Sequence, residues 1–165
     1  HVASGSLGQG LSVACGAALS KRIDGDNHKV YVLLGDGESE EGQVWEAAMF
    51  AAHHKIKNLI AMTDWNRQQI DGPVEKIGGV GDLCAKWKAF GWRVITCDGH
   101  HYDEIRQAYA KANEPQEGPV MILMHTNMGQ GVDFMFDSHK WHGKAPSAEQ
   151  EKQALAQLKE TIGDY

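Results

Sequence analysis

The sequence predicts an α/β protein: a doubly wound parallel sheet with helices on both faces. Short apolar runs alternate with helical segments along the chain, and two long glycine-containing loops follow such runs. The 165 residues suffice for one domain with a sizeable core. We therefore expect residues 1–165 to form a single domain. Because the chain starts at His1 without a methionine, we also expect this domain to be truncated at its amino end.

The elements are predicted in order from their patterns. The apolar run at 29–34 is typical of a strand that is covered on both faces. In the helix at 43–55, Trp45, Met49 and Ala52 are expected to form the buried stripe. The loops at 65–81 and 126–146 fall at the carboxyl ends of strands, where such sheets bind ligands. Helices are predicted at 7–22, 43–55, 82–90, 102–112 and 147–160, and strands at 29–34, 58–63, 92–97 and 120–125.

Composition argues against several classes of function. The net charge of −6 disfavours a nucleic-acid-binding surface. No run of about 18 apolar residues occurs, so no membrane span is expected. Cys15, Cys84 and Cys97 lack CxxC spacing, which favours reduced, buried thiols and a cytoplasmic protein.

Two polar residues at strand ends indicate a metal-held diphosphate. Asp36 lies in Gly35-Asp36-Gly37 after the first apolar run, and Asn66 follows the next run after the 28 residues 38–65. One helix and one strand fit that interval, which brings both strand ends to the same edge of a parallel sheet. Carboxylate and amide oxygens suit Mg²⁺ or Ca²⁺, and glycines permit a close approach of the diphosphate. The alternative is an ordinary Asp-Gly turn.

Three further segments accompany this motif. Residues 4–10, S-G-S-L-G-Q-G, are equally consistent with an ordinary glycine-rich helix start. Residues 66–72 read N-R-Q-Q-I-D-G, and residues 141–146 read W-H-G-K-A-P. Together with the Gly35-Asp36-Gly37 turn, these segments resemble the transketolase family of thiamine-diphosphate enzymes, in the same order along the chain. The resemblance extends to about residue 146, and it departs at Arg67, where the family commonly has glycine.

The resemblance implies a role for each residue of a cofactor site. Asp36, Asn66 and the main-chain carbonyl of Gln68 would bind the metal. His142 would contact the diphosphate and act on donor oxygens as the catalytic residue; the alternative is a surface histidine. Ile70 would pack on the thiazolium ring or be an ordinary core residue. Glu41 would be the family's acidic residue near the subunit interface or a helix N-terminal charge. The implied cofactor-binding set is Gly5, Ser6, Leu7, Gly35, Asp36, Gly37, Glu41, Asn66, Ile70 and His142.

The resemblance also implies the reaction and the partner. Transketolases transfer a two-carbon ketol unit from a ketose phosphate to an aldose phosphate, using thiamine diphosphate and Mg²⁺ or Ca²⁺. The family's pyrimidine-binding domain has no counterpart in these 165 residues. We therefore expect a pyrimidine-binding partner chain and a dimer or heterotetramer of the pentose phosphate pathway. The alternatives are another thiamine-diphosphate enzyme, acting on a modified sugar or a 2-oxo acid, and a non-catalytic module of the same fold.

Overall fold

Four parallel strands form the central sheet in the order β1-β2-β6-β5. The computed structural model describes residues 5–158. The strands pair so that Gly35 lies level with Asp64, and Asp98 lies level with His125. The carboxyl ends of all four strands therefore lie along one edge of the sheet. The strands are β1 (Val30–Gly35), β2 (Leu59–Trp65), β5 (Arg93–Asp98) and β6 (Val120–His125).

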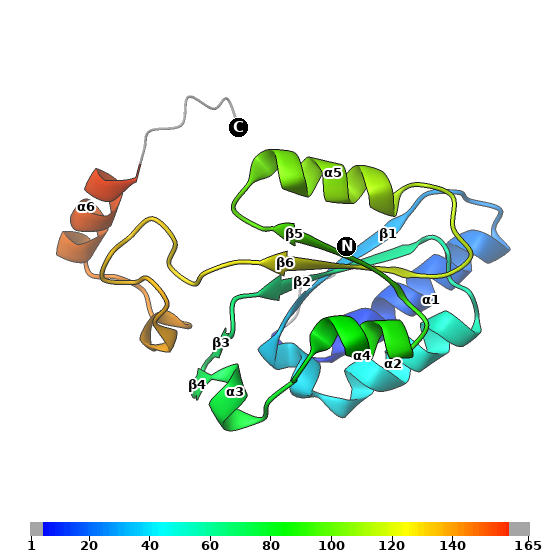
Figure 1. Ribbon diagram of the computed structural model, residues 1–165, viewed down its shortest axis with the longest axis horizontal. Helices are drawn as coiled ribbons and strands as arrows, with labels where there is room; N and C mark the ends of the chain where they lie inside the picture. The colour runs from blue at the N-terminus through cyan, green and yellow to red at the C-terminus, as the bar shows by residue number, and fades with distance from the viewer. Residues whose placement is uncertain (1–4, 159–165) are drawn as a thin grey trace.

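Helices cover both faces of this sheet, so the predicted fold class is confirmed (Figure 1). Alternating residues of β2 face opposite sides, with Leu59 and Ala61 in one buried cluster and Ile60 and Met62 in the other. The first cluster includes residues of α1 (Gln9–Ile23), α2 (Gly42–His53) and α4 (Leu83–Ala89), and the second includes residues of α5 (Tyr102–Ala112).

Strand β1 is an edge strand, and the prediction that it is covered on both faces was wrong for the described part of the chain. Tyr31 is 46% exposed and Leu33 is 61% exposed. Both lie level with residues of β2 that face α5. The helix that the described residues place on that face, α5, packs mainly on β5 and β6. It meets β1 at Tyr31, whose ring centroid lies 6.0 Å from that of Tyr109 and whose hydroxyl donates to Asn113 Oδ1 at 3.2 Å. The apolar run therefore predicted the strand correctly, but it did not predict that one face of the strand is exposed.

The buried stripe of α2 also differs from the expected one. Met49 is 53% exposed, whereas the buried residues are Val44, Ala47, Ala48 and Ala51. Small side chains on this face let α2 pack closely against α1, which presents Leu11, Ala14 and Ala18. Trp45 instead packs on the aromatic ring of Trp87, with 5.0 Å between ring centroids.

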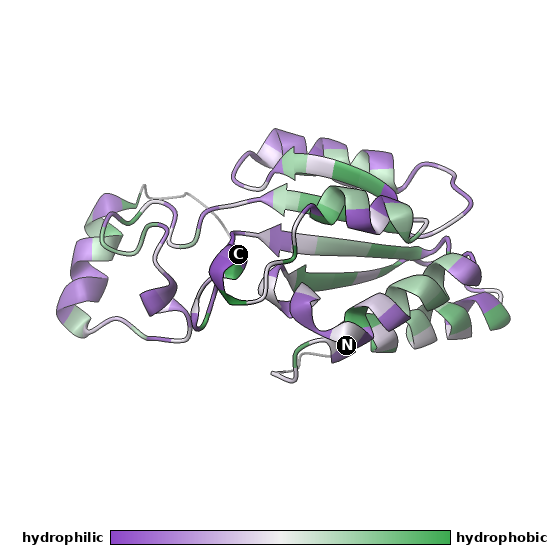
Figure 2. Ribbon diagram, turned by 60° about the horizontal axis from the view of Figure 1, so that its bottom comes forward, coloured by the Kyte–Doolittle hydropathy of each residue, from purple (hydrophilic) through white to green (hydrophobic). Residues whose placement is uncertain are grey.

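Short elements gather at the carboxyl edge of the sheet, at the left of Figure 1. The predicted loop at 65–81 contains a two-stranded antiparallel ladder and one helical turn. Figure 2 shows that the strands are largely hydrophobic, whereas α6 and the segments beyond the strand ends are largely hydrophilic. The short elements are η1 (Gly37–Glu40), β3 (Gln68–Gln69), β4 (Gly72–Pro73), α3 (Val74–Ile77), η2 (His139–Trp141) and α6 (Ala148–Gln157).

A helix suited to crossing a lipid bilayer, by length and hydropathy, is not found within residues 5–158.

Candidate functional site

Asp36 joins the ends of two strands. It follows β1 directly, forms the N-cap of η1 and is 1% exposed. Its Oδ1 accepts a hydrogen bond from the N–H of Gly37 at 2.8 Å, and its Oδ2 accepts one from the N–H of Arg67 at 2.5 Å. Arg67 follows β2, so the convergence predicted from the spacing of Asp36 and Asn66 is present in the structure.

The environment of Asp36 is unfavourable for its negative charge. Burial raises the pKa of the Asp36 carboxyl to about 6, and the nearby charge of Asp64 also raises it, against the lowering effect of the main-chain N–H donors. No Lys or Arg side chain in residues 5–158 forms an ion pair with Asp36 or Asp64. Two neighbouring carboxylates without a side-chain cation are the arrangement that a divalent metal ion would stabilise.

The turn after β2 is held by Asn66. The Asn66 Oδ1 accepts a hydrogen bond from the N–H of Gln68 at 2.8 Å, and its Nδ2 donates to Asp64 Oδ2 at 3.2 Å. Between them Arg67 has a φ of 63°, in the left-handed region that favours glycine. This explains why glycine would suit the position. The backbone conformation is nevertheless formed with arginine, and it directs the Arg67 N–H at Asp36.

Gln68 joins the same turn through its N–H, which donates to Asn66 Oδ1. It is 9% exposed, and its Nε2 donates to Asp137 Oδ1 at 2.8 Å. Its Oε1 is buried without a hydrogen-bond partner among the described residues. In the ladder of β3 and β4 the residue opposite Gln68 is Pro73, which has no N–H to donate. That pairing therefore does not occupy the Gln68 carbonyl.

These donors fit a hard divalent cation. Asp36, Asn66 and the Gln68 carbonyl supply only oxygen, which Mg²⁺ and Ca²⁺ prefer. In the described part of the chain no three His, Cys, Asp or Glu side chains converge on one point. An ion here would therefore rely on one carboxylate, an amide oxygen and main-chain oxygen, together with oxygens from a ligand.

Asp64 was missed in the sequence. Its Oδ1 accepts a hydrogen bond from Thr126 Oγ1, and its Oδ2 accepts from Asn66. It lies level with Gly35 in the sheet, so pairing the two predicted strands residue by residue would have identified it. It links the Asn66 turn to the start of the loop that follows β6.

The two glycines beside Asp36 differ in their surroundings. A Cβ at Gly37 would lie 2.8 Å from Gln69 Cβ, so internal packing requires glycine there. A Cβ at Gly35 would meet nothing closer than 3.9 Å. Protein packing therefore does not explain Gly35, whereas close approach of a ligand to the backbone would.

The segment before α1 lies beside the same turn. Gly5, Ser6 and Leu7 are exposed, with Leu7 at 57%. Glu41 is also exposed and precedes α2 as its N-cap residue, without a side-chain capping bond. A second residue that the sequence did not indicate, Glu38, accepts hydrogen bonds from both glycine-rich segments.

The remaining predicted residues lie on exposed segments. Ile70 is 65% exposed between β3 and β4. His142 follows η2 and is exposed, and its side chain makes no hydrogen bond within residues 5–158. Its loop is attached to the Asn66 turn through the bond between Asp137 and Gln68, and η2 packs beside β4. The structure thus connects the His142 segment to the site but not the His142 side chain itself.

A hollow of about 320 Å³ opens at the same edge of the sheet. His100 Nε2 accepts the N–H of Asn127 at 2.8 Å there, which ties the turn after β5 to the loop after β6. This bond gives His100 a structural role at the edge. The lining residues are Arg67, Asp98, His100, His125, Thr126, Asn127 and Gln130.

These features define a class of protein. A parallel α/β sheet with a buried acidic residue, oxygen donors and glycine-rich turns at its carboxyl edge is a fold that binds phosphorylated cofactors. Residues 1–163 match the family model described as "Transketolase, thiamine diphosphate binding domain". The chain belongs to the transketolase family and is its thiamine-diphosphate-binding domain.

Named relatives agree with this assignment. The chain is 45% identical to the 6-deoxy-6-sulfo-D-fructose transketolase subunit SqwG of Clostridium sp. (strain MSTE9), over 94% of this chain and 56% of that one. It is 38% identical to one of the subunits of the apulose-4-phosphate transketolase of Phocaeicola vulgatus, over 98% and 58%. Transketolase from Campylobacter jejuni superposes with a TM-score of 0.85 and 33% identity, over 94% and 26%. The chain therefore spans little more than half of these two curated subunits.

Proposed function

We propose that this chain supplies the diphosphate-binding half of a transketolase active site, which transfers a two-carbon ketol unit from a ketose phosphate to an aldose phosphate. The observation that carries the proposal is the Asp36 carboxylate, which is buried and bonded to the Arg67 N–H across two strand ends. Membership of the family and relatives named as transketolase subunits support it.

In this proposal Mg²⁺ or Ca²⁺ is held by Asp36, by Asn66 and by the main-chain carbonyl of Gln68. The ion would offset the Asp36 charge that burial disfavours, and it would attract the diphosphate to a chain of net charge −6. Gly35 and Gly37 allow the diphosphate close to the backbone. Gly5, Ser6, Leu7 and Ile70 offer exposed surface for the cofactor rings.

Thiamine diphosphate, when bound, supplies the electron sink for the bond cleavage in ketol transfer. The contribution of the chain is placement and proton handling. His142 would hold or move a proton at the donor oxygens, since its loop is attached beside the Asn66 turn. Glu41 would approach the cofactor from the interface with the partner chain.

We further propose that a pyrimidine-binding chain completes the site in a dimer or heterotetramer, in the cytoplasm. Two relatives that are named as subunits support a separate partner. A modified ketose is the second candidate for the donor, because the relative at 45% identity is named for 6-deoxy-6-sulfo-D-fructose.

The proposal is tested with the full-length protein, alone and mixed with its partner chain. Calorimetry measures thiamine-diphosphate binding with Mg²⁺ present, and a coupled assay measures ketol transfer from ketose phosphates. We expect turnover from the mixture only, and weak cofactor binding by the chain alone. Rapid ketol transfer by this chain alone would refute the division of the site, and no transfer by the mixture would refute the reaction.

A further inference from the structure

We infer that Glu38 is a positioning residue that holds the two glycine-rich segments of the cofactor site at a fixed separation, an inference that rests on the proposed function. Its Oε1 accepts a hydrogen bond from the N–H of Gly8 at 2.8 Å. Its Oε2 accepts one from the N–H of Gly35 at 3.1 Å. Gly8 precedes α1 and Gly35 ends β1, so a single carboxylate joins segments that are distant in sequence.

Gly8 has little freedom to move away from this contact. Its φ is 83°, and a Cβ there would lie 2.9 Å from Glu41 Cβ. Only glycine lets the segment 5–8 lie this close to the start of α2. Residues 5–8 therefore pack against the part of the chain that contains Glu38. The hydrogen bond from Gly8 to Glu38 then fixes the position of Gly8 relative to that part of the chain.

Glu38 also interacts with the amino end of α1. Gly8 is the N-cap of this 15-residue helix and has no side chain to accept an N–H. The Glu38 carboxylate accepts a different hydrogen bond, from the N–H of Gly8 itself, at the helix end where a negative charge is favourable. Gln43 adds a longer contact, from its Nε2 to the Leu7 carbonyl at 3.5 Å.

In this inference Glu38 strengthens cofactor binding, whereas its negative charge alone would weaken it. A carboxylate close to Asp36 makes the site more negative and so disfavours a diphosphate. If Glu38 had no positioning role, neutralising it would strengthen cofactor binding. If it positions the segments, the same change weakens binding, because a glutamine side chain has one acceptor oxygen where the carboxylate has two.

Glu38→Gln therefore separates the two cases, and Glu40→Gln is its matched control. Glu40 lies on the same turn, is exposed and accepts a hydrogen bond from the Gln69 side chain. Both variants are made in the full-length protein and measured in complex with the partner chain. Calorimetry gives the affinity for thiamine diphosphate, and hydrogen exchange of a peptide covering residues 5–11 reports the Gly8 amide without cofactor. Steady-state kinetics gives the KM of the donor.

We expect Glu38→Gln to weaken cofactor affinity about tenfold or more, to speed exchange in the peptide and to leave the donor KM within about twofold. Glu40→Gln should change each value by less than about twofold. Glu38→Asp, which keeps the charge but is one methylene shorter, should also weaken cofactor affinity. This variant tests the positioning role if Glu38→Gln does not fold. Equal or tighter binding by the Glu38 variants with unchanged exchange would overturn the inference alone. A wild-type complex that does not bind the cofactor would overturn the proposed function as well.

Discussion

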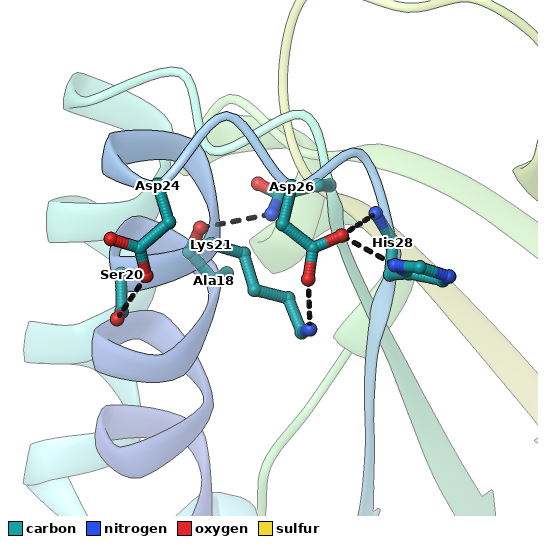
Figure 3. A network of polar contacts seen from close by, with 7 residues as sticks. Ala18, Ser20, Lys21, Asp24, Asp26 and His28 are labelled. Atoms are coloured by element: carbon teal, nitrogen blue, oxygen red, sulfur yellow. Dashed lines mark hydrogen bonds and ion pairs between the residues drawn. The ribbon is translucent and has the colours of Figure 1, made fainter.

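Asp26 and Asp36 lie at opposite ends of β1 and have opposite electrostatic environments. Asp26, at the amino edge, accepts hydrogen bonds from Lys21 Nζ at 2.6 Å and from the N–H of His28 at 2.9 Å (Figure 3). These donors hold the pKa of Asp26 well below its ordinary value. Asp36 is buried at the carboxyl edge, where no Lys or Arg of the described segment forms an ion pair with it, and its pKa is raised to about 6. The charge of Asp26 is offset by donors within the chain, whereas that of Asp36 is disfavoured by its burial.

The difference is not one of available space. A hollow of about 430 Å³ at the amino edge is larger than the one at the carboxyl edge, and Asp26 lines it. Size alone would favour the amino edge, whereas ligands of parallel α/β sheets bind at the carboxyl ends of the strands. The buried carboxylate of Asp36, with its raised pKa, favours the carboxyl edge as well.

The largest expected effect is that of Asp36→Ala on cofactor binding. We expect metal-dependent binding of thiamine diphosphate to weaken by at least about 100-fold, because the only carboxylate among the proposed metal ligands is removed. The fold should persist, which circular dichroism can check. Asp26→Ala is the control at the other edge and should leave the affinity unchanged. Unaltered affinity in the Asp36 variant, measured by calorimetry with Mg²⁺, would remove Asp36 from the metal site.

The next effect concerns His142 and separates turnover from binding. His142→Ala should lower kcat with a ketose phosphate by about 10²- to 10⁴-fold, the usual contribution of a general acid or base. Cofactor affinity should fall by only about 0.5–1.5 kcal/mol, since one hydrogen bond is lost. His28→Ala, at the amino edge, should change neither value. Wild-type kcat in the reconstituted His142 variant would mean that this exposed histidine is an ordinary surface residue.

The two aspartates should also give opposite pH dependences of stability. Because the folded pKa of Asp36 is raised, its contribution is fully present below about pH 4 and is lost as the pH rises through about 6. The loss should reach at most about 3 kcal/mol in the metal-free protein. Asp26 has a lowered folded pKa, so its contribution is present above its unfolded pKa and is lost only in more acidic solution.

Urea unfolding of the metal-free protein between pH 4 and 8 measures this. Asp36→Asn should flatten the decline towards neutral pH, and saturating Mg²⁺ should flatten it in the wild type. Asp26→Asn should leave the decline in place. An identical pH profile for Asp36→Asn and the wild type would show that Asp36 ionises normally in the folded chain.

The sequence predicted those parts of the molecule that depend on local pattern. Apolar runs located the four strands of the central sheet but not the short β3 and β4, and the spacing of Asp36 and Asn66 placed both at one edge. Whether a strand face is covered by a helix depends on residues that are distant in sequence. The exposure of the Leu33 side chain therefore could not be predicted from the pattern of β1 itself. Glu38 was missed for a similar reason, since its partner Gly8 is 30 residues away.

The smallest effect should come from Arg67→Gly, which tests whether the left-handed turn is as described. Glycine relieves about 1 kcal/mol of strain at φ 63° but loses about the same in the greater freedom of the unfolded chain, so the net change should lie within about 0.5 kcal/mol. Arg22→Gly is the matched change at the amino edge. Arg22 lies in the last turn of α1 and donates to the His54 carbonyl at 2.9 Å, so its replacement by glycine should cost about 1 kcal/mol. Urea unfolding compares the two variants directly. If Arg67→Gly costs as much as Arg22→Gly, the turn that directs the Arg67 N–H at Asp36 depends on the arginine side chain rather than on backbone geometry.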